Sequence, residues 1–277
     1  MTSETMSLKS KINAYAKQNG IAAQVVLQNY MFDRFLIRLA KSEFKDKFVI
    51  KGGMLVAKIV GLDIRSTMDL DTTLIHLLLT ENSIHEYIEK IAKTDVQDGI
   101  TFTVKGIEPI MKEDVYGGFC VRIDAVFETI ITPLSIDVST GDAITPEAVP
   151  YEFSCLFDNE EVFSLMGYNI ESVLAEKIET ILRRGVFNTR PRDFYDSFIL
   201  ATTQPFDQSV FEKALTATAK HRNSLEKISD VKTILTQIEN SPDLKETWKR
   251  YQAKFPYARD ISYEKIIANL KNLMKQI

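Results

Sequence analysis

The sequence predicts an α/β domain followed by an all-helical domain. Between residues 48 and 139, alternating runs typical of strands are separated by segments of helical periodicity. From about residue 165 to the C-terminus, apolar residues recur only at helical spacing. The 277 residues, 45% of them hydrophobic, are enough for one large core or two modest ones. We therefore expect an N-terminal domain over 1–155 and a helical C-terminal domain over 156–277.

The elements of the first domain follow from local patterns. In chain order we expect two helices within 7–41, a strand at 48–51, a helix of two to three turns from about 54, a strand at 68–74, a helix at about 80–94, and strands at 100–104, 119–127 and 134–139. Asn19-Gly20 separates the first two helices, and Tyr116-Gly117-Gly118 is the expected turn of a hairpin. Pro146 and Pro150 then mark a loop.

The second domain shows one helical segment after another. We expect helices at 170–185, 191–203 and 207–221, in a stretch near 229–254, and at 262–276.

The composition limits the classes of function. A net charge of −4 gives no global attraction for polyanions, so contact with nucleic acid would need a local basic patch. Two distant cysteines and three histidines match no metal-binding spacing. No secretory signal and no run of about 18 apolar residues is present, so we expect a cytoplasmic protein without a membrane partner.

Two acidic residues carry the strongest functional signal. Asp69 and Asp71 lie two positions apart in a predicted strand, so their side chains project from one face, while Met68 and Leu70 supply the buried face. Carboxylates that project together repel each other unless positive charge lies between them. The usual solution is Mg²⁺, or Mn²⁺, which also holds the phosphates of a nucleotide. The alternative is a surface strand with two solvated acids.

The preceding glycines fit a nucleotide site. Gly52 and Gly53 would let a phosphate approach the backbone, and the N–H groups that open the next helix would face it. The alternative is a tight turn between strand and helix. In this order, the glycines and the aspartates resemble the hG[GS]…DhD signature of the nucleotidyltransferase superfamily.

A third carboxylate would complete a metal site. Asp137 lies on the polar face of a predicted strand and could also accept a proton from an acceptor hydroxyl. Asp124 lies on the polar face of another strand and remains the rival, and an ordinary exposed acid is the alternative for either. We prefer Asp137 because the Ser-Thr-Gly-Asp sequence after it resembles the turn that the nucleotidyltransferase family has at this place.

The helical domain offers positive charge for phosphates. Lys177 has no acidic neighbour at i±3 or i±4, so its ammonium group extends to water or to a partner off its helix, for which a nucleotide phosphate is the candidate. Arg190 and Arg192 belong to the densest basic cluster, where they could grip triphosphate or RNA. Asp193 either orients Lys177 or an arginine, or complements a helix dipole. Arg65 either contacts phosphate or pairs with an acid nearby.

The order of these motifs resembles the AbiEii/AbiGii toxin family. The resemblance covers residues 45–200 through five short motifs: Lys51-Gly-Gly, Arg65-Ser-Thr-Met-Asp-Leu-Asp71, Ile136-Asp-Val-Ser139, Leu174-Ala-Glu-Lys177 and Arg190-Pro-Arg-Asp193-Phe-Tyr-Asp196. These proteins are nucleotidyltransferase-like toxins of abortive-infection, type IV toxin–antitoxin systems, and the mycobacterial MenT toxins are similar. The implied fold is a nucleotidyltransferase-like domain with a mixed sheet plus a helical domain.

The resemblance also implies a function. Lys51, Gly52 and Gly53 would form the phosphate-binding turn, Asp69 and Asp71 the metal-binding pair, and Lys177 and Asp193 two later essential motifs. Family members use an NTP with magnesium, and some add nucleotides to the 3′ end of tRNA, which stops translation. The expected partners are an NTP, a tRNA acceptor, and an antitoxin that regulates transcription without forming a stable complex. A small-molecule or protein acceptor, or a non-catalytic nucleotide-binding module, is the alternative.

One position departs from the pattern of such enzymes. The residue after the two glycines is often Ser or Thr, but here it is Met54. Phosphate binding at this turn would therefore rest on backbone N–H groups.

Overall fold

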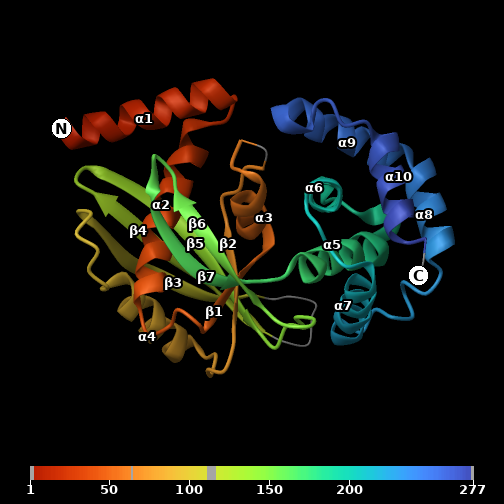
Figure 1. The fold of residues 1–277 in the computed structure, drawn as a ribbon, viewed down its shortest axis with the longest axis horizontal. Helices are drawn as coiled ribbons and strands as arrows, with labels where there is room; N and C mark the ends of the chain where they lie inside the picture. Colours follow the sequence, from red (N-terminus) through yellow and green to blue (C-terminus); the bar gives the residue numbers. More distant parts are fainter. Residues whose placement is uncertain (1–2, 64, 111–116, 276–277) are drawn as a thin grey trace. The chain divides into compact units, whose positions relative to one another are not determined.

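The computed structural model describes residues 3–63, 65–110 and 117–275 (Figure 1). The chain divides into two compact units. The first comprises Met1–Gly141 and Val149–Gly167, and the second comprises Asp142–Ala148 and Tyr168–Ile277.

The first unit is built on a seven-stranded mixed sheet. Its elements in chain order are α1 (Ser3–Asn19), α2 (Ala23–Lys41), β1 (Phe48–Lys51), α3 (Gly52–Val60), β2 (Leu70–Leu74), α4 (Glu81–Ala92), β3 (Ile100–Ile110), β4 (Gly118–Phe127), β5 (Ile130–Thr140), β6 (Val149–Cys155) and β7 (Asp158–Gly167). The strand order is β3-β4-β5-β2-β1-β7-β6. The pairs β2–β5 and β1–β7 are parallel and the other neighbours are antiparallel, so the expectation of a mixed sheet is confirmed.

One hairpin was not predicted from the sequence. Strands β6 and β7 pair over the segment that Pro150 had marked as loop, with Pro150 opposite Met166. Strand β6 lies at the edge of the sheet, and an edge strand tolerates proline because one row of its N–H groups needs no partner. The predicted domain limit at 155 therefore falls inside a hairpin, and the first unit extends to Gly167.

Two details around the predicted strands differ. Met68 was expected on a buried face but is 41% exposed, because β2 begins only at Leu70 and the alternation does not reach back to Met68. The predicted hairpin forms between β3 and β4. Its expected turn begins at Tyr116, which lies outside the described residues.

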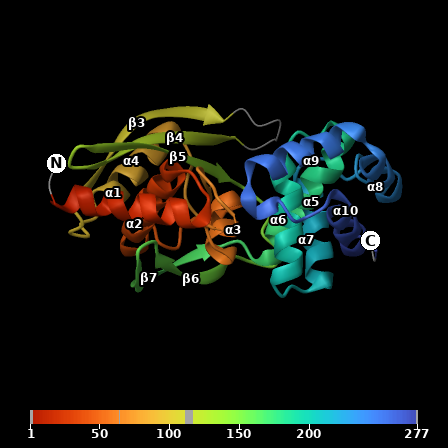
Figure 2. The ribbon, with the colours of Figure 1, turned by 90° about the horizontal axis from the view of Figure 1, so that it is seen from above.

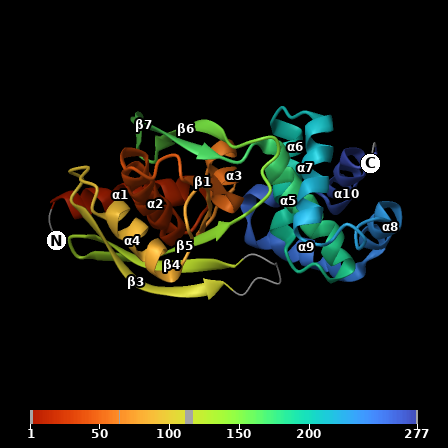
Figure 3. The same ribbon diagram turned by 90° about the horizontal axis from the view of Figure 1, so that it is seen from below.

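Helices cover the sheet of the first unit. Helix α2 contacts α1, α4, β5 and β7, as Figure 2 shows, and α4 lies against β3 and β4 (Figure 3). One stripe of α2 is wholly buried, including Phe32, Phe35 and Leu36. Met54 on α3 is also fully buried, so its side chain contributes to this core.

The second unit is helical, as expected. It contains α5 (Ile170–Arg184), the 3₁₀ turn η1 (Gly185–Phe187), α6 (Pro191–Thr203), α7 (Gln208–His221), α8 (Val231–Asn240), α9 (Pro242–Lys254), η2 (Pro256–Ala258) and α10 (Tyr263–Leu273). Helix α5 contacts α6, α7 and α8. Five of these helices begin with a capping residue whose side chain accepts a hydrogen bond from a backbone N–H group of the first turn. The capping residues are Asn169, Asp207, Asp230, Ser241 and Ser262. The starts of α5, α7 and α10 lie within one residue of the predicted ones, whereas the separation of α8 from α9 was not predicted.

Candidate active site

A row of polar side chains crosses four neighbouring strands of the first unit. Asp71 on β2 is paired with Lys51 on β1 and with Asp137 on β5, and Asp137 is paired with Cys120 on β4. Because directly paired residues project from the same face of a sheet, the carboxylates of Asp71 and Asp137 lie side by side. Asp69 lies one residue before β2, and its side chain is exposed.

The glycine turn lies directly against Asp71. Helix α3 begins at Gly52, and the Gly53 N–H donates a long hydrogen bond of 3.4 Å to Asp71 Oδ2. Gly52 has a φ of +61°, and a Cβ atom there would lie 2.1 Å from Asp71 Oδ2. Only glycine therefore fits between this turn and the carboxylate. The positive end of α3 faces the acidic row, as expected of an anion-binding turn.

Arg65 covers the start of the same helix. Its side chain is almost fully buried at 2% exposure, and a Cβ atom on Gly53 would lie 2.9 Å from Arg65 Nη2. Arg65 Nη1 donates a hydrogen bond to the Ser66 carbonyl. A guanidinium and a helix N-terminus both carry positive charge, so an anion placed here would be stabilised by both.

The sheet register separates the two candidates for a third carboxylate. Asp137 is the direct neighbour of Asp71, whereas Asp124 is paired with Pro133, which lies four residues before Asp137 on β5. Asp124 Oδ2 instead lies 3.7 Å from Lys105 Nζ. The structure thus brings Asp137, and not Asp124, beside the acidic pair.

Sequence analysis did not identify Cys120 as part of this row. Its Sγ lies 3.0 Å from Ser135 Oγ. Burial, with a further contribution from Asp137, raises the pKa of the thiol. At neutral pH Cys120 is a protonated neighbour of the carboxylates and adds no charge. Only the pairing of β4 with β5 reveals its position.

The acidic row fits a metal bound together with a nucleotide. In the described part of the chain, no three His, Cys, Asp or Glu side chains are close enough to form an all-protein cage. Mg²⁺ seldom uses such a cage, since one or two carboxylates, water and substrate phosphates usually complete its octahedron. Asp71 and Asp137 supply hard oxygen donors beside an anion-binding turn. These residues fit a magnesium–nucleotide complex better than a permanently bound ion.

In the second unit, Lys177 reaches partners off its helix. Its Nζ lies 3.0 Å from Asp193 Oδ1 and 3.0 Å from Asp196 Oδ2, both on α6, and its side chain is 10% exposed. Asp193 Oδ2 in turn lies 2.8 Å from Arg190 Nε. Asp193 thus holds both Lys177 and an arginine, which is one of its two expected roles. That Lys177 binds phosphate remains a prediction.

Asp196 is a member of this cluster that sequence analysis passed over as a site residue. It is fully buried, and it lies one helical turn after Asp193 on the same face of α6. The i, i+3 spacing was visible in the sequence, but nothing local indicated that α6 faces Lys177.

The basic residues of the second unit differ in their exposure to solvent. Arg183 pairs with the fully buried Glu179, which also accepts from Arg222. Arg190 and Arg192 are exposed at the start of α6. Near them, the turn η1 holds Phe187 with 85% of its surface exposed.

Comparisons with known proteins define the class. A crystal structure of a candidate nucleotidyltransferase from H. pylori aligns with a TM-score of 0.50 at 16% identity, over 92% of this chain and 97% of that chain. The JHP933 protein of Helicobacter pylori aligns with a TM-score of 0.49 at 17% identity, over 92% of this chain and 94% of its own. The first alignment shows that the fold is nucleotidyltransferase-like. A comparison with curated protein sequences gives no match.

The family follows from the sequence as a whole. The family model described as the nucleotidyl transferase AbiEii toxin of type IV toxin–antitoxin systems matches residues 34–269, and the chain belongs to this family. The resemblance seen in the short motifs is confirmed. Membership implies a cognate antitoxin as a partner. Among the described helices, none has the length and apolar character that crossing a membrane requires.

Proposed function

We propose that the protein is a metal-dependent toxin that transfers a nucleotide from an NTP to the 3′ end of tRNA and so arrests translation. The observation that carries the proposal is the pairing of Asp71 with Asp137 beside the Gly53 N–H. In this reaction the acceptor hydroxyl oxygen forms a bond to the α-phosphorus, the bond from that phosphorus to the bridging oxygen breaks, and pyrophosphate leaves.

The residues of the first unit have separate roles in this proposal. Asp71 and Asp137 would hold Mg²⁺ or Mn²⁺ together with phosphate oxygens of the NTP, and we propose the exposed Asp69 as a further ligand in that complex; the ion would supply charge neutralisation for the triphosphate. Asp137 also accepts the proton of the attacking hydroxyl. The Gly52-Gly53 turn and Arg65 bind phosphate oxygens, with Lys51 on the adjacent strand. Catalysis then consists mostly of placement and electrostatics.

Within the second unit itself, positively charged side chains are candidates for binding phosphates. Lys177, held by Asp193 and Asp196, and the exposed Arg190 and Arg192 are the groups we assign to phosphates. The exposed Phe187 favours RNA among possible acceptors. An exposed aromatic ring beside arginines is a platform on which an unpaired base can stack, while the arginines contact the backbone.

In the cell, growth arrest by this activity would serve abortive infection as a defence against phage. The antitoxin would then act as a transcriptional regulator without binding the toxin stably. These roles extend what membership of a type IV toxin–antitoxin family implies.

Label transfer tests the proposal. Purified protein is incubated with Mg²⁺, each α-³²P-labelled NTP and total RNA, and RNA, protein and small-molecule fractions are separated. We expect label in tRNA, and we expect Asp69→Ala and Asp71→Ala each to abolish both transfer and growth arrest. Asp124→Ala is the matched control, because it removes a strand acid outside the row.

Each other outcome has a defined meaning. Label in a small molecule or a protein would replace tRNA as the acceptor and leave the chemistry intact. NTP binding that is independent of magnesium, with no transfer to any fraction, would refute the enzyme and favour a nucleotide-binding module. Growth arrest that persists without Asp69 and Asp71 would refute the mechanism.

A further inference from the structure

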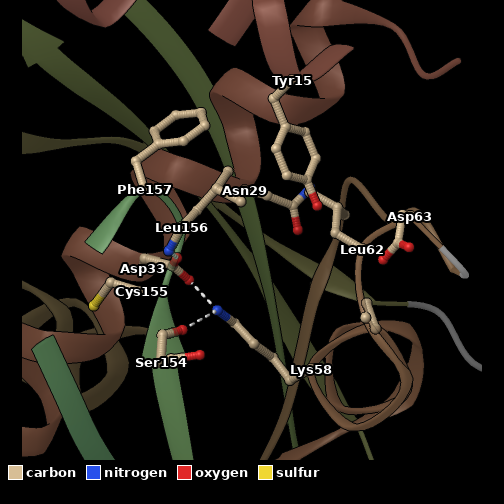
Figure 4. Close-up of a pocket in the computed structure, with 12 residues that line it drawn as sticks. Tyr15, Asn29, Asp33, Lys58, Leu62, Asp63, Ser154, Cys155, Leu156 and Phe157 are labelled. Carbon is tan, nitrogen blue, oxygen red and sulfur yellow. Dashed lines mark hydrogen bonds and ion pairs between the residues drawn. The ribbon is translucent and has the colours of Figure 1, made fainter. Parts of the chain in front are cut away.

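A pocket in the first unit lies at the opposite end of α3 from the glycine turn. Its volume is about 430 Å³, within the range of small-molecule sites (Figure 4). Its walls come from α1, α2, the second half of α3 and the residues that follow it, and the end of β6 with the β6–β7 turn. The first residue of α3 that lines the pocket, Ala57, lies five residues after Gly52, so roughly 7.5 Å of helix separates the two. No residue of the acidic row lines it.

One wall of the pocket is aromatic. The rings of Tyr15 and Phe157 meet edge to face with their centroids 5.9 Å apart, and the centroid of the Tyr30 ring also lies 5.9 Å from that of Phe157. Phe157 has a φ of 73°, a left-handed conformation that costs a non-glycine residue free energy. The neighbouring Leu156 N–H donates to Asp33 Oδ2 at 2.7 Å, which holds the turn in this conformation. The turn therefore presents the Phe157 ring to the pocket.

The charged groups of the pocket leave no cation for an anionic ligand. Lys58 is ion-paired with the buried Asp33 and also contacts the Ser154 carbonyl oxygen at 3.5 Å. Asp63 lines the same pocket, and burial, together with the negative charge of Asp63, raises the pKa of the Tyr15 phenol. Two carboxylates against one ammonium leave a net charge of −1. A free phosphate or a triphosphate would be repelled.

A buried amide supplies a hydrogen-bond acceptor. Asn29 is 5% exposed, and its Nδ2 donates to the carbonyl oxygens of Val25 at 2.8 Å and Thr67 at 2.7 Å. These two bonds fix the amide with its oxygen directed into the pocket (Figure 4). Among the described residues none donates to that Oδ1 atom, and none hydrogen-bonds the Tyr15 hydroxyl. A ligand with N–H donors would satisfy the Asn29 oxygen and the Asp63 carboxylate.

We propose that this pocket binds a nucleobase that carries an exocyclic amino group, either as a free nucleoside or as one base of an RNA strand. The rings of Tyr15 and Phe157 offer the flat apolar contact that a base requires. Asn29 and Asp63 accept hydrogen bonds from the two N–H groups of the amino group or, in guanine, from the amino group and the ring N–H. The net negative charge of the pocket repels phosphate groups, so the pocket favours the base of a nucleotide over its phosphates. The proposal goes beyond nucleotide transfer and does not depend on it.

Calorimetric titration of the full chain with adenosine, cytidine, guanosine and uridine tests the proposal. We expect at least one amino-bearing nucleoside to bind about tenfold more tightly than uridine. Uridine lacks the amino group and therefore loses roughly one hydrogen bond to a charged group, which accounts for a difference of this size. Tyr15→Leu and Asp63→Asn should each weaken that binding about tenfold. Asp46→Asn, which changes an exposed acid outside the pocket, should leave binding unchanged. Asp71→Asn should also leave it unchanged, because Asp71 lies at the other end of α3.

The remaining arms identify the source of the base and the results that overturn the proposal. Displacement of the nucleoside by short single-stranded RNA assigns the pocket to an RNA base, and lack of displacement assigns it to a free nucleoside. The proposal fails if no nucleoside binds at millimolar concentration. It also fails if binding survives Tyr15→Leu and Asp63→Asn but is lost in Asp71→Asn, since the base would then occupy the candidate active site.

Discussion

Asp71 on β2 and Asp137 on β5 are direct partners in a parallel strand pair. Two carboxylates so placed repel each other when no cation lies between them. Asp137→Asn should therefore leave the thermal stability of the metal-free protein unchanged or slightly higher, while nucleotide transfer falls at least a hundredfold. The stabilisation that Mg²⁺ and an NTP give together should also be lost. Melting temperatures with and without Mg²⁺–NTP, together with label transfer, measure both effects.

Asp124→Asn provides the matched control for this prediction. Asp124 is a strand acid that pairs with the half-exposed Lys105, and such pairs contribute about 0–1 kcal/mol. Transfer and metal-dependent stabilisation should stay close to wild type. If Asp124→Asn lost as much activity as Asp137→Asn, the assignment of the third carboxylate from sheet register would be wrong.

Gly52 should tolerate no side chain. Gly52→Ala forces a non-glycine residue to a φ of +61° and places a Cβ atom 2.1 Å from Asp71 Oδ2, so either the turn or the carboxylate must move. The left-handed conformation alone costs about 1–2 kcal/mol. We expect a lower melting temperature and a loss of transfer larger than the loss of folded protein explains. Steady-state transfer rates per folded molecule measure this.

Gly106 on β3 is the control for that substitution. A Cβ atom there has no neighbour within 4 Å, so Gly106→Ala should be neutral or slightly stabilising. Equal losses for the two alanine variants would show that the Gly52 contact with Asp71 has no special role.

Features set by local chain geometry were predictable from the sequence. The Gly52-Gly53 turn and the strand that carries Asp71 follow from residue type and alternation within a few positions. The helix predicted at 170–185 follows from the periodicity of its apolar residues, and α5 begins at Ile170. The β6–β7 hairpin was missed because Pro150 reads as a loop residue, and only its place at the sheet edge makes it compatible with a strand.

Features that depend on which elements meet were not predictable. The absence of acids beside Lys177 on its own helix indicated an external partner, but not that α6 would supply both Asp193 and Asp196. The choice between Asp137 and Asp124 was likewise open until the strand register was known. Both strands have the same alternating pattern, so the pattern carries no information about their neighbours.

A buried ion pair in the first unit should make stability depend on pH. Arg38 donates two hydrogen bonds to Asp98, Nη1 to Oδ2 at 2.8 Å and Nη2 to Oδ1 at 2.7 Å, and both side chains are nearly buried. Burial raises the pKa of Asp98, but the bonds from Arg38 and the Ile100 N–H outweigh it, so the pKa lies below its ordinary value of 3.8. The contribution to stability is complete above that value and is lost as the pH falls through the lower pKa of the folded state.

Asp98→Ala tests this dependence. It leaves the buried Arg38 without its carboxylate partner and should cost about 3 kcal/mol of unfolding free energy at neutral pH. The difference from wild type should shrink below about pH 4, where wild-type Asp98 takes up its proton. Urea unfolding at neutral and acidic pH measures both values. Glu108→Ala, which breaks the exposed pair with Arg122, should cost under about 1 kcal/mol at either pH. A cost for Asp98→Ala that did not vary with pH would contradict the ion-pair explanation.

Phe187 should contribute to RNA binding and not to folding. Its ring is 85% exposed on η1, a turn that contacts α8, so Phe187→Ala removes little buried surface and should leave the melting temperature unchanged. Stacking of one base contributes about 1–3 kcal/mol, so the KM for acceptor RNA should rise about tenfold while kcat at saturating RNA stays constant.

Leu78→Ala removes a comparably exposed apolar side chain (71%) from the first unit and should change neither constant. If Phe187→Ala lowered kcat without raising the KM, the ring would act on the chemical step and the stacking role would be excluded. If both variants raised the KM equally, the effect would reflect general surface hydrophobicity and not a base-stacking platform.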